Sequence, residues 1–93
     1  MMYPFMTLND KTEIVHSESL IDDNGREYVR VYIERPVFQG FQSAECLLPA
    51  YEWVMNDGFS EEEIADFQEF FQSVSHIIIQ LARDGGFENA SGF

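Results

Sequence analysis

The chain has 93 residues, of which 45% are hydrophobic, and it carries 17 acidic against 5 basic residues for a formal net charge of −12. A chain of this length and hydrophobic content forms one small domain, residues 1–93, and is not disordered throughout. The negative charge argues against direct binding to nucleic acid, whose phosphates are neutralised by Lys and Arg, and against docking on anionic membranes.

Cellular location is constrained by three features. The apolar runs are only a few residues long, far short of the ~20 residues that cross a membrane. No basic stretch of an export signal precedes the first apolar residues, since Lys11 follows them. Cys46 is the single cysteine, which rules out an intramolecular disulfide and favours a reducing compartment. We therefore expect a cytoplasmic protein with no membrane association.

The N-terminal half predicts an arm followed by a hairpin. Residues 1–10 are expected to be an arm, because Pro4 and Asn9-Asp10 break regular structure. Residues 12–20 and 27–35 are expected to form two strands around Asp22-Asp23-Asn24-Gly25. Asn-Gly between strand-like runs is a strong hairpin signal, because both turn residues accept positive φ.

Two alternating patterns indicate which strand faces meet the core. In residues 28–34 the aliphatic side chains of Val29, Val31 and Ile33 alternate with polar and aromatic ones. Residues 41–48 form a third predicted strand, with small or aliphatic side chains on one face (Ala44, Cys46 and Leu48). The meander is thus expected over residues 12–48.

A short helix is expected between the meander and the last element. Pro49 suits the first position of a helix, and residues 50–56 would end at Gly58 as a left-handed cap.

The clearest element is a long helix over residues 60–84. Ser60-Glu61-Glu62-Glu63 is a capping box, in which the Ser60 side chain and the Glu63 side chain each satisfy the other's backbone N–H. Apolar residues follow with a 3-4-3-4-3 spacing, widened by Phe70 and Ile77, and the main positions are Ile64, Phe67, Phe71, Val74, Ile78 and Leu81. Gly85-Gly86 ends the helix, and in the tail, residues 85–93, Phe87 is expected to fold back onto the last turn.

These elements predict an α+β fold, a three-stranded antiparallel β-meander packed against one long C-terminal α-helix, in the order β-β-β-α. That order and the small size resemble those of HicB-like antitoxins. The resemblance rests on element order and size and includes no residue motif, so it assigns no residue a role.

The sequence offers no convincing catalytic, cofactor or metal site. His76 and Glu69 lie on the polar side of the helix, but their seven-residue spacing does not match the Glu-x-x-His pattern of helical metal sites. Cys46 is on the inward strand face, where a free cysteine acts as a small hydrophobe. We therefore expect a protein that is not an enzyme and holds no cofactor, with a hydrolase or metal-dependent activity at His76 and Glu69 as the enzymatic alternative.

Charge distribution points instead to a protein partner. Residues 36–82 contain eight acids and neither Lys nor Arg, and Glu62, Asp66 and Glu69 share one side of the helix. Such a surface either keeps the protein soluble or attracts a basic protein. The predicted function is a protein–protein interaction module. The alternatives are a DNA-mimic inhibitor of the antirestriction or anti-CRISPR type, which highly acidic small proteins resemble in composition, and an antitoxin-like partner of a basic protein.

A second surface is expected on the sheet. One helix covers only one face of a three-stranded sheet, whereas Tyr28, Tyr32, Phe41 and Leu47 are assigned to the other face. Either the arm, with Tyr3 and Phe5, or a second copy of the chain should cover it. We favour the homodimer.

Overall fold

The computed structural model describes residues 1–86, which form six strands followed by one helix. The elements are β1 (Met2–Thr7), β2 (Glu13–Ser17), β3 (Leu20–Ile21), β4 (Glu27–Val37), β5 (Gly40–Leu48), β6 (Glu52–Asp57) and α1 (Glu61–Asp84).

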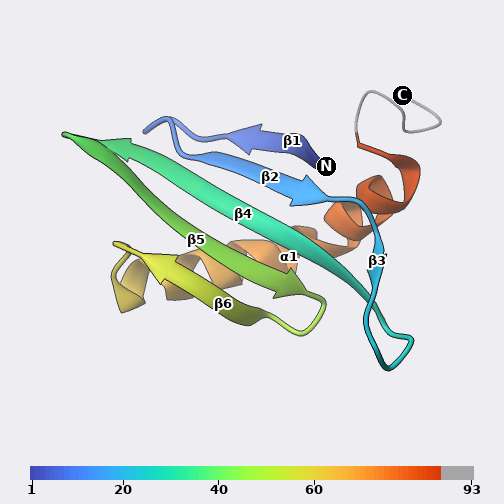
Figure 1. Ribbon diagram of the computed structural model, residues 1–93. Helices are drawn as coiled ribbons and strands as arrows, with labels where there is room; N and C mark the ends of the chain where they lie inside the picture. Colours follow the sequence, from blue (N-terminus) through green and yellow to red (C-terminus); the bar gives the residue numbers. More distant parts are fainter. Residues whose placement is uncertain (87–93) are drawn as a thin grey trace.

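The strands form one antiparallel sheet in the order β1-β2-β4-β5-β6, and the short β3 pairs with β4 beside β2. Helix α1 runs behind the sheet and covers one face, while the face turned to the viewer in Figure 1 carries no helix. The fold is therefore α+β in two layers with a C-terminal helix, as predicted. The three-stranded meander is wrong, because the sheet has six strands.

Strand β1 replaces the predicted arm. Residues Met2–Thr7 pair with β2 at the edge of the sheet, with an irregularity in register between Pro4 and Met6. Proline lacks a backbone N–H, and an edge strand tolerates this because one side of the strand has no partner. Pro4 therefore marks an edge strand and not a chain break, and Phe5 packs against the core on the helix side.

Strand β6 replaces the predicted short helix. The chain turns sharply after β5, with Tyr51 at a φ of 57°, and then pairs with β5 from Glu52 to Asp57. The run Trp53-Val54-Met55 suits a strand, where aromatic and branched side chains pack well on a pleated surface. Gly58, with a φ of 106°, ends a strand and not a helix.

The predicted hairpin is present, with a different turn. Asp22 N–H donates to the Arg26 carbonyl and Gly25 N–H to the Asp22 carbonyl, so three residues form the loop. Within this turn only Gly25 has a positive φ, at 76°, in contrast to the two positive-φ residues expected from Asn-Gly. The predicted strand over residues 12–20 is divided into β2 and β3, which pair with different parts of β4.

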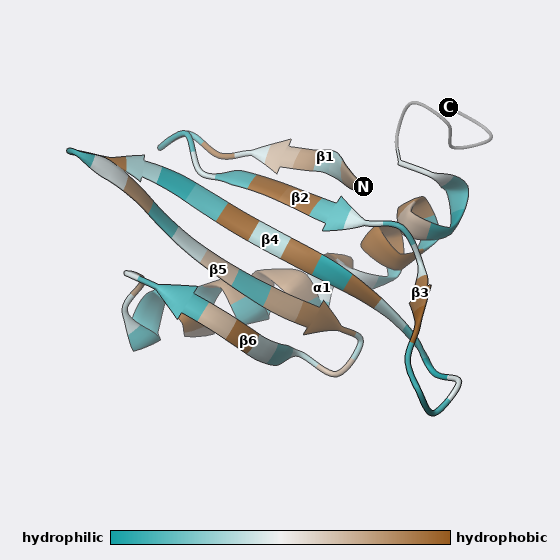
Figure 2. Cartoon of the chain, viewed as in Figure 1, coloured by the Kyte–Doolittle hydropathy of each residue, from teal (hydrophilic) through white to brown (hydrophobic). Residues whose placement is uncertain are grey.

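The core lies between the sheet and α1, and the predicted inward faces are confirmed. Val29, Val31 and Ile33 of β4 are fully buried, as are Ala44, Cys46 and Leu48 of β5. Bands of hydrophobic and hydrophilic residues alternate along β4 in Figure 2. The helix contributes Phe71, Ile78, Leu81 and Ala82 as buried residues.

The helix begins and ends as its sequence indicates. Ser60 Oγ accepts from the backbone N–H of Glu63 at 3.1 Å, Glu63 Oε1 accepts from the N–H of Ser60 at 3.1 Å, and Gly85 caps the C-terminus with a φ of 83°. The apolar side of the helix differs from the prediction at one edge, where Ile77 is exposed and Ile79 packs against the core instead. The expected contact of Phe87 lies outside the described residues.

Candidate functional site

The acidic helix face consists of Glu62, Asp66 and Glu69, and all three side chains are exposed. Their spacing of four and three residues places them on one side of α1, roughly 6 and 4.5 Å apart along the axis. Within residues 1–86 none of these carboxylates forms an ion pair. The face thus presents uncompensated negative charge, as the sequence predicts.

Most of the positive charge is committed to intramolecular pairs. Arg30 Nη2 lies 2.8 Å from Glu45 Oε1, Arg35 Nη1 lies 2.6 Å from Glu63 Oε2, and Arg83 Nε lies 2.9 Å from Glu27 Oε2. Hydrogen bonds from Arg83 and from the Ser19 hydroxyl lower the pKa of Glu27 to about 2. These pairs join strand to strand or helix to strand, so the arginines are not available to neutralise the acidic helix face.

Arg35 shows how this protein holds a guanidinium group. Its Cζ lies 4.8 Å from the centre of the Phe59 ring, and Nη1 faces carboxylates of both Glu63 and Asp10, at 2.6 and 3.7 Å. It also donates to the Gln42 side chain. The hydrogen bond from Arg35 lowers the pKa of Glu63. The Phe59 ring and the Glu63 carboxylate thus both contact the same guanidinium group.

The predicted dimer face is only partly brought together. Tyr28 and Leu47 line one hollow, but Tyr32 lies four residues further along β4, about 13 Å away at the usual strand rise. The Arg30–Glu45 ion pair lies between them, since Arg30 pairs with Leu47 and Glu45 with Tyr32 in the sheet register. The open face is therefore a mixture of polar and apolar groups.

A row of acids crosses the same open face, and sequence reasoning missed it. Glu13 lies directly opposite Glu34, Glu34 opposite Ser43, and Ser43 opposite Asp57. Like charges in directly opposed positions destabilise a sheet. The row depends on strand β6 and on the register of β2 against β4, and neither follows from the local sequence patterns.

Phe41 lies apart from the other three predicted residues, near the tip of the β4–β5 hairpin. Phe38, in the two-residue turn, is 92% exposed, Phe41 is 62% exposed, and Val37 is also exposed. The hairpin extends to one end of the sheet in Figure 1. Pro36 and Gly40 in the sequence indicate a turn here, whereas the exposed apolar tip is evident only in the structure.

The candidate catalytic groups lie apart from one another. Cys46 is buried, and burial raises the pKa of its thiol to about 12, which disfavours the nucleophilic thiolate. His76 and Glu69 are exposed on the helix. Within residues 1–86 no group of three or more His, Cys, Asp or Glu side chains is arranged to hold a metal ion.

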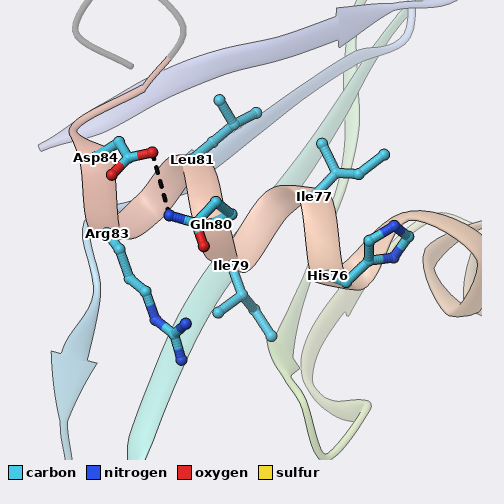
Figure 3. A pocket seen from close by; sticks show the side chains of 7 residues that line it. All are labelled: His76, Ile77, Ile79, Gln80, Leu81, Arg83 and Asp84. Carbon is cyan, nitrogen blue, oxygen red and sulfur yellow. Dashed lines mark hydrogen bonds between the residues drawn. The ribbon is translucent and has the colours of Figure 1, made fainter. Parts of the chain in front are cut away.

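A hollow beside His76 offers no cluster of groups that could act together on a ligand. It has a volume of about 630 Å³ and follows the last turns of α1, where Gln80 donates to Asp84 at 3.2 Å (Figure 3). Ile77 and Leu81 point to one side of the helix and Ile79 and Arg83 to the other, so the groups do not converge on one point.

Comparison with family models, with curated proteins and with solved structures gives no match to this chain. No helix in residues 1–86 is long and apolar enough to span a membrane. The resemblance to HicB-like antitoxins loses its basis as well, because the observed element order is six strands and a helix.

Proposed function

We propose that this protein is a non-enzymatic, cytoplasmic interaction module that binds a basic protein through the acidic helix face of Glu62, Asp66 and Glu69. The observation that carries the proposal is the division of charge. The arginines at positions 30, 35 and 83 are held in intramolecular pairs, whereas the acids of this face have no cationic partner within residues 1–86. Complementary charge of this kind accelerates association and selects the partner.

The experiment reverses the charge of this face. In a variant carrying Glu62→Lys, Asp66→Lys and Glu69→Lys, the association rate with a partner captured by the wild-type chain should fall sharply. Wild-type association should weaken between low and high salt, because the Debye length shrinks from about 10 Å at 0.1 M to about 3 Å at 1 M. The apolar side of α1 is unchanged, so the variant should remain folded.

A matched control separates the location of the charge from its amount. Glu13→Lys, Glu52→Lys and Asp57→Lys change the net charge equally at exposed positions on the sheet. This control should keep most of the association rate. If the two variants behave alike, or if binding ignores both salt and charge reversal, the acidic helix face is only a solubilising surface.

The DNA-mimic alternative makes a further demand on the same experiment. The captured partner must be a nucleic-acid-binding protein, and duplex DNA must compete with this chain for it. If the helix variant and salt both weaken binding but DNA does not compete, the basic-partner proposal stands and the DNA-mimic alternative is excluded.

A homodimer through the open sheet face is a second candidate for assembly. It is favoured by one observation, that neither the helix nor the N-terminal segment covers this face. Tyr28, Tyr32 and Leu47 are only half-buried there, and Phe41 is exposed.

A further inference from the structure

We propose that an apolar pocket beside the acidic helix face receives an arginine side chain of the basic partner, with Asp66 as its counter-ion. This inference rests on the proposed function and names the group that the partner must present. The pocket has a volume of about 340 Å³, at the lower end of the ~300–1,000 Å³ usual for ligand sites. Its lining residues are Leu8, Glu63, Asp66, Phe67 and Phe70.

The apolar walls of the pocket are held in place by neighbouring groups. Phe67 packs edge-on against Phe59, with ring centres 5.3 Å apart, and both Phe67 and Phe70 pack against the buried Phe71 ring. Leu8 belongs to a tight loop in which its N–H donates to the Thr12 carbonyl at 2.8 Å. The site therefore needs little ordering when a ligand binds.

The two carboxylates at the pocket differ in availability. Glu63 already accepts from the backbone N–H of Ser60 and pairs with Arg35. Asp66 is exposed and has no ion pair or hydrogen bond to another side chain within residues 1–86. Lys11 and Asp10 lie in the adjoining loop, and Asp10 faces Arg35. A cation entering the pocket would therefore pair with Asp66.

The binding of Arg35 supports a guanidinium ligand. Next to the pocket, the Arg35 guanidinium lies over the Phe59 ring and pairs with Glu63, which also lines the pocket. The pocket offers the same combination, with the rings of Phe67 and Phe70 beside the Asp66 carboxylate. A guanidinium stacks on aromatic rings and pairs with a carboxylate through two hydrogen bonds, whereas an ammonium acts as a point charge. The aliphatic stem of arginine would cover Leu8.

The test uses a defined probe and the whole chain. A capped six-residue peptide of alternating alanine and arginine is titrated into the protein while backbone amide signals are followed by NMR. Matched peptides carry lysine or citrulline, a neutral analogue of arginine. We expect the arginine peptide to shift the signals of Leu8, Phe67 and Phe70, the lysine peptide to bind more weakly, and the citrulline peptide to leave them unchanged.

Paired variants distinguish the pocket from the general negative field. Asp66→Asn should weaken binding of the arginine peptide about tenfold, the loss expected for one charge-assisted hydrogen-bonded contact. Glu69→Gln removes the same charge from the same helix side, but Glu69 lines a different hollow, so it should weaken binding less than about twofold.

Three results would overturn the pocket. If the citrulline peptide binds as tightly as the arginine peptide, the pocket does not recognise the guanidinium group. If the amide signals that shift belong to residues outside the pocket, the peptide binds elsewhere. Equal weakening by Asp66→Asn and Glu69→Gln would show a diffuse attraction, in which case the acidic helix face would still stand as the proposed function. The proposed function itself would fail on a different result, namely partner binding that is unchanged by added salt and by the triple Lys substitution.

Discussion

His16 is fully buried on β2, and its two ring nitrogens have unequal surroundings. Nδ1 lies 2.8 Å from the backbone carbonyl of Ser17, which only accepts, so Nδ1 carries the proton of the neutral ring. Nε2 is buried and has no hydrogen-bond partner within residues 1–86. The Tyr3 ring of β1 lies beside the His16 ring, with centres 5.6 Å apart. Protonation would place a charged N–H at Nε2, where no group of the described part of the chain accepts it.

Stability should therefore fall in mildly acidic solution. Burial lowers the pKa of His16 from 6.5, so below this pH the unfolded chain binds the proton more readily than the folded chain does. The stability of the folded chain is therefore not reduced by His16 above pH 6.5, and it decreases as the pH falls below this value. Asp10, Glu27 and Glu63, whose pKa values are lowered from 3.8 or 4.5, act at lower pH. The midpoint of urea unfolding should drop between pH 6.5 and about 5.

Two histidine variants test the assignment. His16→Leu should flatten the pH dependence of the urea midpoint in this range, whatever its effect on total stability. His76→Gln changes an exposed histidine and should keep the pH dependence. A wild-type midpoint that is constant from pH 7 to about 5 would refute the role of His16.

At the scale of elements, α1 is held to the sheet by an aromatic cluster around Phe71. The Phe71 ring is fully buried, and its centre lies 6.1 Å from that of Trp53 on β6 and 5.9 Å from that of Phe70. Trp53 in turn donates to the Gln68 side chain at 3.0 Å. The cluster thus joins the helix to a strand that the sequence did not predict.

Removing this ring should nearly unfold the protein. Phe71→Ala is expected to lower the free energy of unfolding by about 3–5 kcal/mol, a large part of the ~5–15 kcal/mol available to a small domain. Ile77→Ala on the exposed flank of the helix should cost much less. Urea unfolding followed by circular dichroism gives both values. A Phe71→Ala midpoint near that of wild type would mean that the ring is not central to the core.

At the scale of the whole molecule, the net charge determines how salt affects a homodimer and how it affects a complex with a basic protein. Two copies of this chain each carry a net charge of −12, and a dimer through the open face would bring their rows of Glu13, Glu34 and Asp57 together. Added salt screens the repulsion between two copies of the chain, which favours the dimer. It also screens the attraction to a basic partner, which disfavours the complex. Salt should therefore strengthen a homodimer and weaken the proposed complex.

Light scattering over a range of salt concentrations tests the homodimer. The wild type should reach twice the chain mass of 10.8 kDa, most completely at high salt. Tyr32→Glu on the open face should return it to the monomer mass, whereas Gln72→Glu, which adds the same charge on the exposed side of α1, should not. A wild type that remains monomeric at every salt concentration would exclude this assembly.

The local sequence alone determined α1, the hairpin around Gly25 and the inward faces of β4 and β5. Each of these depends on contacts between residues close in sequence, such as the Ser60–Glu63 capping box, or on the alternation of side chains along a single strand. The acidic helix face was equally predictable, because the helix repeat places Glu62, Asp66 and Glu69 on one side without reference to any other element.

Only the tertiary structure decided the extent of the sheet and the surroundings of the candidate sites. Strands β1 and β6 exist because they pair with β2 and β5, and Pro4 and Pro49 gave local signals for a break and a helix that this pairing overrides. The opposed Glu13 and Glu34, and the pocket joining Leu8 to Phe70, bring together residues distant in sequence. Strand pairing depends on contacts across the whole sheet, whereas helix formation depends on neighbours within one turn, so local patterns predicted the helix and missed both edge strands.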